Sequence, residues 1–195
     1  MTNARECGIL TAAKRDSGPR EEAEVLNRQI YLIGMPGSGK STLGRRAARD
    51  TGLSFTDLDE WIEERAGMTV PEIFEKYGEA GFRKMETGAL ASLTRARPGI
   101  VSPGGGAAMN PVNQKIMRAW GSIILLDRPL ERILEDLRTE NRPLLKDDPE
   151  GKLRELYDAR MPVYRQLADV TIRNEGDFQE AAAALARVLK ERYHA

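Results

Sequence analysis

The chain has 195 residues, 41% hydrophobic and 31% charged, with 30 Lys and Arg balanced by 30 Asp and Glu. This length buries one substantial core and is too short for two large domains. Zero net charge provides no long-range attraction for nucleic acid or an anionic membrane, so neither is expected as a partner. The single cysteine and histidine, Cys7 and His194, exclude a disulfide framework, a structural zinc site and a His-activated nucleophile.

Hydropathy predicts a cytoplasmic protein. No apolar run approaches the ~20 residues that cross a bilayer, and the first thirty residues lack a secretory hydrophobic segment. We expect a monomer without membrane contact.

Residues 1–28 are polar, with balanced charge and few apolar side chains. They predict a flexible extension that ends in a short helix over residues 21–27. A single domain is expected over residues 29–195.

From residue 29 onward, short apolar runs alternate with amphipathic segments, which is typical of an α/β domain with a parallel sheet. The five predicted strands cover residues 29–33, 54–56, 99–102, 122–126 and 169–172.

Helix starts are marked by capping sequences. Thr69 and Glu72 form a capping box, and Asn110 and Asp148 each precede a proline. Asp177 begins an alanine-rich helix that is expected on the surface over residues 180–192.

Residues 34–41, GMPGSGKS, follow the first predicted strand and match the phosphate-binding pattern G-x-x-x-x-G-K-[ST] in full. Its glycines allow successive N–H groups to point at a phosphate, and the following helix N-terminus adds partial positive charge. The alternative is a glycine-rich turn without a ligand. The pattern predicts ATP contacts from Gly37, Ser38, Gly39, Lys40, Ser41 and Thr42, with the Ser41 hydroxyl also on Mg²⁺.

Two acids, Asp57 and Asp59, leave the end of the second predicted strand. Strand alternation places both on one side, at the sheet edge where ligands bind. One can serve the metal ion while the other accepts a hydrogen bond from a substrate hydroxyl. The alternative is that they only cap the next helix.

Arg83 and Glu86 are three residues apart in a predicted helix and share one face. A guanidinium held by a carboxylate is ready to bind a second carboxylate with two hydrogen bonds. The alternative is a solvated surface ion pair.

Pro103 precedes three glycines, residues 104–106, whose bare amides can approach a ligand closely. The alternative is a flexible turn. Further along, residues 139–151 have the composition of a mobile lid that carries Arg142, and Arg160 lies on the next helix. Taken alone, each of these arginines fits a solvated side chain better than a catalytic one.

The ordered segments GMPGSGKST, FTDLD, AGFRKMET, PGGG, NRPLL and LYDARMPVY resemble the shikimate kinase family over residues 29–192. The resemblance implies a P-loop, nucleoside-monophosphate-kinase-like, three-layer α/β/α fold with a mobile lid. Its five-stranded parallel sheet has the order 2-3-1-4-5. The implied reaction is ATP- and Mg²⁺-dependent phosphorylation of the 3-hydroxyl of shikimate to shikimate 3-phosphate, within aromatic amino-acid biosynthesis.

The resemblance also implies roles for single residues. Lys40 and Ser41 become ligands of phosphate and Mg²⁺, and Asp57 contacts the ion through water. Asp59 accepts from the substrate hydroxyls and is the base. The implied grip on the shikimate carboxylate and ring comes from Arg83, Arg160, Gly104, Gly105 and Gly106. Arg142 is the catalytic lid arginine, and the candidates for further nucleotide contact are Arg138, Arg173 and Asn174.

The chain departs from the family at Pro103, where Thr or Ser is usual, and in residues 1–28, which have no counterpart in its minimal form. Two other functions stay open: a kinase for another polyol acid such as gluconate, and a non-catalytic ligand sensor on the same scaffold. The presence of Lys40, Asp59 and Arg142 argues against a sensor.

Overall fold

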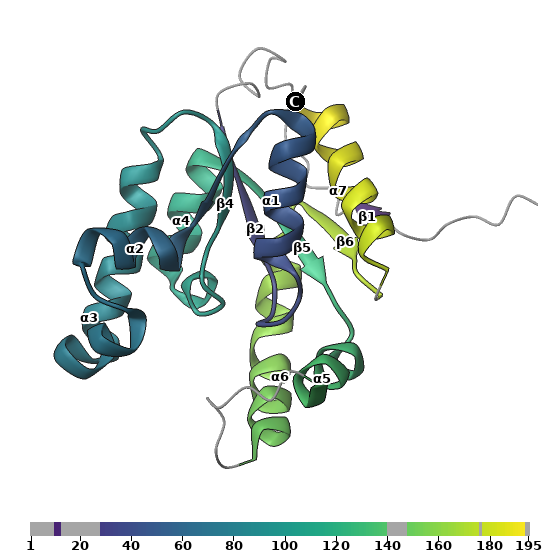
Figure 1. The fold of residues 1–195 in the computed structure, drawn as a ribbon. Helices are drawn as coiled ribbons and strands as arrows, with labels where there is room; N and C mark the ends of the chain where they lie inside the picture. Colours follow the sequence, from purple (N-terminus) through teal and green to yellow (C-terminus); the bar gives the residue numbers. More distant parts are fainter. Residues whose placement is uncertain (1–9, 13–27, 140–147, 176, 194–195) are drawn as a thin grey trace, which may run out of the picture.

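A computed structural model describes residues 10–12, 28–139, 148–175 and 177–193 of the chain. A six-stranded sheet runs through the centre of the molecule in the order β1-β6-β5-β2-β4-β3 (Figure 1). Its strands are β1 (Leu10–Ala12), β2 (Gln29–Ile33), β3 (Ser54–Asp57), β4 (Gly99–Ser102), β5 (Gly121–Asp127) and β6 (Val170–Arg173).

Five of the strands, β2 to β6, are parallel, and counted from β2 their order is 2-3-1-4-5. The predicted fold class and strand order are therefore confirmed. The central strand β2 is buried along its whole length, and its side chains alternate between two cores. Tyr31 and Ile33 face one side of the sheet, while Ile30 and Leu32 face the other.

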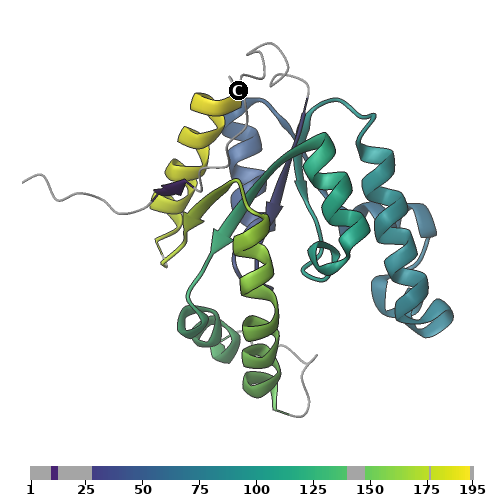
Figure 2. The same cartoon turned by 180° about the vertical axis from the view of Figure 1, so that it is seen from behind.

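Helices cover both faces of the sheet and make three layers (Figures 1 and 2). Residues of α1 and α7 pack on one face, and residues of α3, α4 and α6 pack on the other. The helices are α1 (Lys40–Thr51), α2 (Leu58–Ala66), α3 (Val70–Leu93), α4 (Pro111–Trp120), α5 (Leu130–Thr139), α6 (Pro149–Leu167), α7 (Phe178–Tyr193) and the short 3₁₀ helix η2 (Ala107–Met109).

The predicted caps form. The Thr69 amide donates to Glu72 Oε2 at 2.7 Å, and the Val112 amide donates to Asn110 Oδ1 at 2.9 Å. The Gly151 amide likewise donates to Asp148 Oδ1 at 3.0 Å. These bonds satisfy backbone donors that the first helical turn leaves open.

The alanine-rich helix α7 is a core layer, which corrects the expectation of a surface helix. Ala181, Ala184, Leu185 and Leu189 are buried against α1 and the sheet. Small side chains allow the two helices to approach closely, so the alanines reflect packing.

The strand β1 pairs antiparallel with β6, and the composition of the polar extension did not predict it. A three-residue run of Leu-Thr-Ala carries too little alternation to indicate a strand. The helix expected over residues 21–27 lies outside the described residues, as does most of the lid predicted at residues 139–151. Within the described ranges, no helix is both long and apolar enough to span a bilayer.

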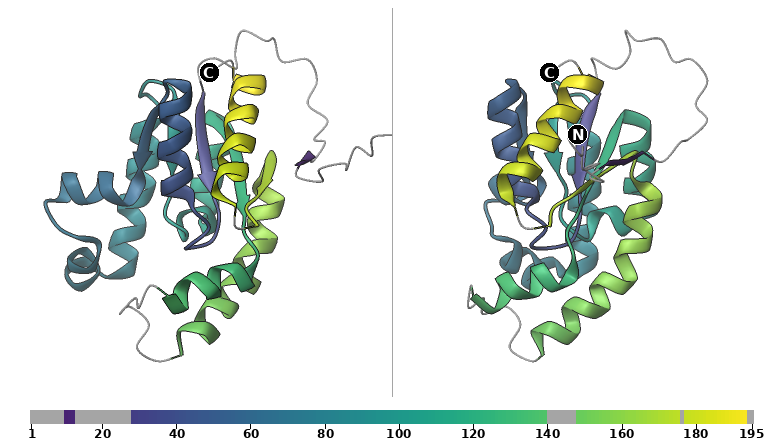
Figure 3. Two further views of the ribbon diagram at one scale, coloured as in Figure 1. Left: turned by 45° about the vertical axis from the view of Figure 1, so that its right-hand side comes forward. Right: turned by 90° about the vertical axis from the view of Figure 1, so that its right-hand side faces the viewer.

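The carboxyl ends of the parallel strands lie between two groups of helices. In Figure 1, α2 and the start of α3 extend to one side of these ends, and α5 with the start of α6 extends to the other. A side view shows both groups reaching beyond the edge of the sheet (Figure 3). Loops that follow β2, β3 and β4 are thereby brought together.

A buried glutamine at the start of β2 connects the sheet to the C-terminal end of α3. Gln29 is 4% exposed, and its Nε2 donates to the carbonyls of Leu93 (2.9 Å), Ala96 (3.2 Å) and Arg97 (3.2 Å). Its Oε1 accepts from the Gly99 amide at 3.0 Å. One side chain thus satisfies backbone groups where α3 ends and β4 begins.

We expect Gln29→Leu to lower the free energy of unfolding by about 2–3 kcal/mol, because buried backbone groups lose their partners. Urea denaturation measures this, with Gln179→Leu on the exposed start of α7 as the matched control. Equal stability of the two variants would contradict the role of Gln29.

Candidate active site

The loop of residues 34–41 connects β2 to α1 with the backbone that its glycines permit. Gly37 and Gly39 have φ angles of 79° and 92°, and the Ser38 amide donates to the Met35 carbonyl at 3.1 Å. Because α1 begins at Lys40, its open N–H groups point into this loop. The arrangement is suited to a bound phosphate.

Lys40 folds over the same loop. Its Nζ donates to the carbonyls of Gly34 at 3.0 Å and Met35 at 2.9 Å. Burial lowers the pKa of Lys40 to about 8, against the opposing charges of Asp57 and Asp59. An additional anion bound nearby would therefore stabilise the charged form of Lys40.

The two predicted metal ligands lie in contact. Ser41 Oγ donates to Asp57 Oδ2 at 2.7 Å, and Asp57 Oδ1 accepts from the Asp59 amide at 3.1 Å. The capping alternative thus holds for one oxygen of Asp57, which is the N-cap of α2. The other oxygen and the Ser41 hydroxyl form a pair of hard donors of the kind that suits Mg²⁺.

The described residues contain no group of three or more His, Cys, Asp or Glu side chains that could hold a metal ion. A divalent cation at Ser41 and Asp57 therefore needs further oxygens, which nucleotide phosphates and water supply.

Asp59 lies in the first turn of α2, and its Oδ1 is buried with no hydrogen-bond partner among the described residues. Burial raises the pKa of Asp59, and the charge of Asp57 raises it further. The oxygen Oε1 of Glu86 is a second buried acceptor without a partner there. A Cβ atom added to Gly104 would lie 2.8 Å from Asp59 Oδ1 and 3.1 Å from Glu86 Oε1. Both acceptors thus flank one bare peptide, where hydroxyl groups can donate to them.

The Arg83–Glu86 pair is part of this site and is not a solvated ion pair. Glu86 is fully buried, and its Oε2 accepts from Arg83 Nη1 at 2.6 Å. A second carboxylate, Glu79, accepts from Arg83 Nη2 at 3.0 Å. A Cβ atom on Gly106 would lie 2.5 Å from Arg83 Nη1, so the guanidinium rests on the glycine loop.

Arg160 reaches the same loop from α6. A Cβ atom on Gly105 would lie 3.0 Å from Arg160 Nη1 and 3.4 Å from Pro36 of the phosphate-binding loop. The charge of Arg160 also acts on Lys40 and on Glu86. Charged side chains thus contact each of the three glycines, and the segment is not merely a flexible turn.

The predicted residues that lie together are Lys40, Ser41, Asp57, Asp59, Arg83, Gly104, Gly105, Gly106 and Arg160, and Gly37, Ser38 and Gly39 complete the adjoining loop. Thr42 is exposed on α1. Arg142 lies outside the described residues, and Arg138 belongs to the last turn of α5.

Asn174 and Arg173 have different surroundings. Asn174 is buried and donates to the Ser38 carbonyl at 3.0 Å, so it supports the phosphate-binding loop from behind. Arg173 lines a cavity of about 380 Å³ at the carboxyl ends of β5 and β6, with Asp127 and Tyr157. This cavity contains none of the residues that converge on the glycine loop.

Two supporting residues were missed in the sequence. The Arg128 guanidinium donates to the Gly37 carbonyl at 3.2 Å and pairs with Asp136 of α5 at 2.8 Å. Tyr164 donates from its hydroxyl to the Gly105 carbonyl. The sequence analysis gave neither a role, although Tyr164 ends the segment LYDARMPVY one helical turn after Arg160.

Comparison with known proteins decides the family. The sequence model described as shikimate kinase matches residues 36–190. The chain belongs to the shikimate kinase family. A shikimate kinase of Thiobacillus denitrificans is 43% identical over 162 residues, 82% of this chain and 87% of that protein. One from Acinetobacter baylyi is 41% identical over 174 residues, 88% and 96% of the two chains.

A solved structure agrees with this family. The shikimate kinase of Acinetobacter baumannii in complex with shikimate superposes with a TM-score of 0.76 at 38% identity, over 87% of this chain and 95% of that chain. A gluconokinase of Sinorhizobium meliloti reaches a TM-score of 0.53 at 17% identity, a likeness of fold alone.

Because the carboxylate of Asp59 is buried, we expect that replacing it with a neutral side chain stabilises the protein by an amount that depends on pH. A carboxyl group whose pKa is higher in the folded than in the unfolded protein makes the free energy of unfolding fall as pH rises between the two values. Ionised Asp59 therefore lowers the free energy of unfolding at pH 7. This effect is absent below about pH 3.9, the pKa of an aspartate in the unfolded chain.

We expect Asp59→Asn to melt at a higher temperature than the parent at pH 7, with a gain that shrinks as the pH approaches 4.5. The exposed Asp158→Asn on α6 is the control. Thermal scans across this range measure both, and a gain independent of pH would contradict the assignment.

Proposed function

We propose that this chain transfers the γ-phosphoryl group of ATP to the 3-hydroxyl of shikimate and releases shikimate 3-phosphate and ADP. One observation carries the proposal: a phosphate-binding loop and a two-arginine glycine loop meet at Gly105, near the buried Asp59 Oδ1, which has no hydrogen-bond partner among the described residues. The substrate named for the similar Acinetobacter baumannii protein is consistent with it.

The nucleotide binds at the P-loop side. Residues 37–42 supply N–H groups and the α1 N-terminus, and Lys40 leaves its own loop carbonyls to contact the β- and γ-phosphates. Ser41 and Asp57 would hold Mg²⁺, since both present oxygen atoms and Ser41 Oγ already lies 2.7 Å from Asp57 Oδ2. When bound, the ion neutralises the charge of the phosphate oxygens.

The acceptor binds at the glycine-loop side. Arg83 and Arg160 grip its carboxylate, and Arg83 is already held in place by Glu79 and Glu86. Asp59 and Glu86 accept hydrogen bonds from ring hydroxyls, which satisfies the two buried oxygens that lack a partner in the described structure. The molecule that receives the phosphoryl group is therefore small, carries one carboxylate and presents several hydroxyls.

The chemistry needs little covalent help from the protein, because phosphoryl transfer depends on alignment and charge neutralisation. Asp59 orients the attacking hydroxyl and takes up its proton, a role that a raised pKa favours. Arg142, with Arg138 as a further nucleotide contact, completes the site from the lid. These two roles rest on the family resemblance.

We place the activity in residues 29–195, with residues 1–28 as an extension outside the catalytic domain. The reaction belongs to aromatic amino-acid biosynthesis, and we propose that a monomer carries it out in the cytoplasm.

A coupled assay of ADP formation with a panel of hydroxy acids tests the proposal. We expect kcat/KM for shikimate to exceed that for gluconate by at least about 100-fold, because a site with buried polar groups rejects an acceptor that leaves them unpaired. Excess chelator is expected to abolish turnover. Faster turnover of gluconate would support the alternative kinase, and no turnover of any acceptor would support a ligand sensor.

A further inference from the structure

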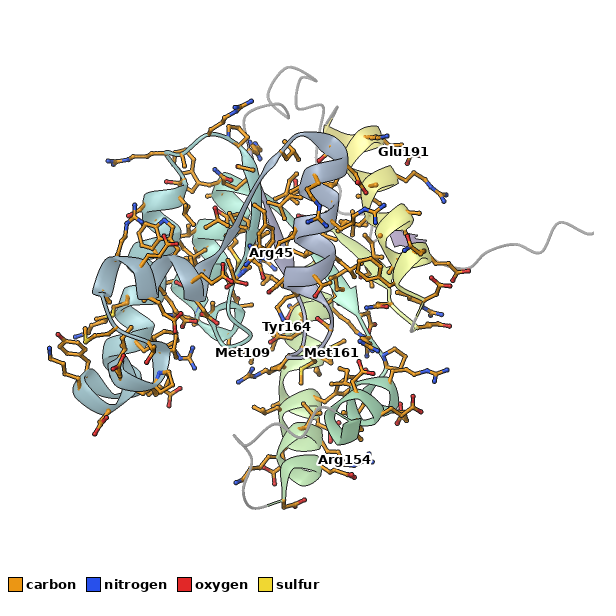
Figure 4. All side chains as sticks on the ribbon, viewed as in Figure 1. Arg45, Met109, Arg154, Met161, Tyr164 and Glu191 are labelled. Carbon is orange, nitrogen blue, oxygen red and sulfur yellow. The ribbon has the colours of Figure 1, made fainter. Side chains whose placement is uncertain are left out.

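A tyrosine of α6 to which the sequence analysis gave no role contacts the glycine loop of the site. Tyr164 is fully buried in the core between the sheet and the helices. Figure 4 labels it near the centre of the molecule, with Met109 at the end of the short helix η2 that follows the glycine loop. The helices α6 and η2 pack against each other.

We propose that Tyr164 is a positioning residue for the acceptor, which fixes the Gly105–Gly106 peptide and the Arg160 guanidinium in the orientation that binds the substrate. This inference deepens the proposed function and rests on it.

Tyr164 is bonded to the peptide that joins Gly105 to Gly106. The Tyr164 hydroxyl donates to the Gly105 carbonyl. The described chain has no cis peptide bond, so the Gly106 N–H points opposite to that carbonyl and away from Tyr164. In the same described residues, loop hydrogen bonds run from Ala107 to Gly104 and from Met109 to Gly106. The Gly106 N–H takes no part in them and is available to a ligand.

Arg160 lies four residues before Tyr164 on one face of α6. The charge of Arg160 acts on the Tyr164 phenol, whose oxygen can still accept a hydrogen bond while its proton is donated to the loop. Burial raises the pKa of Tyr164, so the phenol stays protonated and remains a donor to the loop. The hydroxyl of Tyr164 is thus bonded to the peptide against which the Arg160 guanidinium lies.

Residues 104–106 lack side chains that could hold the loop, and glycine has the largest conformational freedom of any residue. Neighbours must therefore set the orientation of the Gly105 peptide. Pro36 limits it from the P-loop side, and Tyr164 supplies the hydrogen bond. Loss of that bond allows the peptide to rotate while the fold persists.

The test uses Tyr164→Phe with Tyr31→Phe as a matched control. Both tyrosines are fully buried in the same core, but the Tyr31 hydroxyl has no hydrogen-bond partner among the described residues. Each variant loses one buried oxygen, and only Tyr164→Phe loses the bond to the loop.

We expect Tyr164→Phe to raise the KM for shikimate about tenfold, with the KM for ATP within about twofold of the parent. Tyr31→Phe is expected to leave both unchanged. An equal rise in both KM values, or no rise for shikimate, would overturn the positioning role.

A second measurement works without turnover. Amide signals of Gly105 and Gly106 in ¹H–¹⁵N spectra of the protein without added substrate are expected to shift in Tyr164→Phe and to stay in place in Tyr31→Phe. Unmoved signals would overturn the inference even if the kinetics changed. A parent protein that does not phosphorylate shikimate would instead refute the proposed function, while the amide signals still report on the loop.

Discussion

The acceptor half of this site depends on three consecutive residues that carry no Cβ atom. Gly104 lies against Asp59 and Glu86, Gly105 against Arg160, and Gly106 against Arg83. At Gly104 and Gly106 an added Cβ would fall within 3.0 Å of a charged group, and at Gly105 it would reach 3.0 Å. The convergence of two arginines and two carboxylates on one loop is possible because the backbone is bare.

That convergence has a cost in stability, and the surrounding fold offsets it. Asp59 and Glu86 keep buried oxygens without a partner in the described structure, and burial raises the pKa of each carboxyl. Lys40 is held with a lowered pKa by burial in the neighbouring loop. Two apolar cores, one on each face of the parallel sheet, support these unfavourable groups. Sites built in this way bind ligands strongly because the ligand supplies the missing partners.

Much of the fold could be predicted because the signals were local and mutually consistent. The strand over residues 29–33 is hydrophobic from Ile30 to Ile33 and runs directly into a complete phosphate-binding pattern, so its position in the chain was well defined. Capping boxes and N-terminal prolines marked three helices correctly. The strand β1 was missed, since its pairing with β6 depends on an edge that only the assembled sheet provides.

The sequence predicted which residues form the site, but not how deeply they are buried or what they contact. Sequence spacing placed Arg83 and Glu86 on one face, yet burial of Glu86 follows from the packing of α3 against the glycine loop. The role of Tyr164 was overlooked for the same reason, because only the fold shows that the Gly105 carbonyl lies beside its hydroxyl. For Arg142 and the lid, the chemistry remains a prediction from resemblance.

The central claim is that shikimate is held against the bare glycine loop, and calorimetric titration of shikimate into Gly106→Ala tests it most directly. The added methyl group meets the Arg83 guanidinium, whereas a Cβ on Gly88 in α3 has no atom within 4 Å, which makes Gly88→Ala the matched control. The account predicts that Gly106→Ala weakens shikimate binding at least about tenfold, roughly 1.4 kcal/mol, while ADP binding is retained and Gly88→Ala binds as the parent does. Parent-like affinity for shikimate in Gly106→Ala would contradict it.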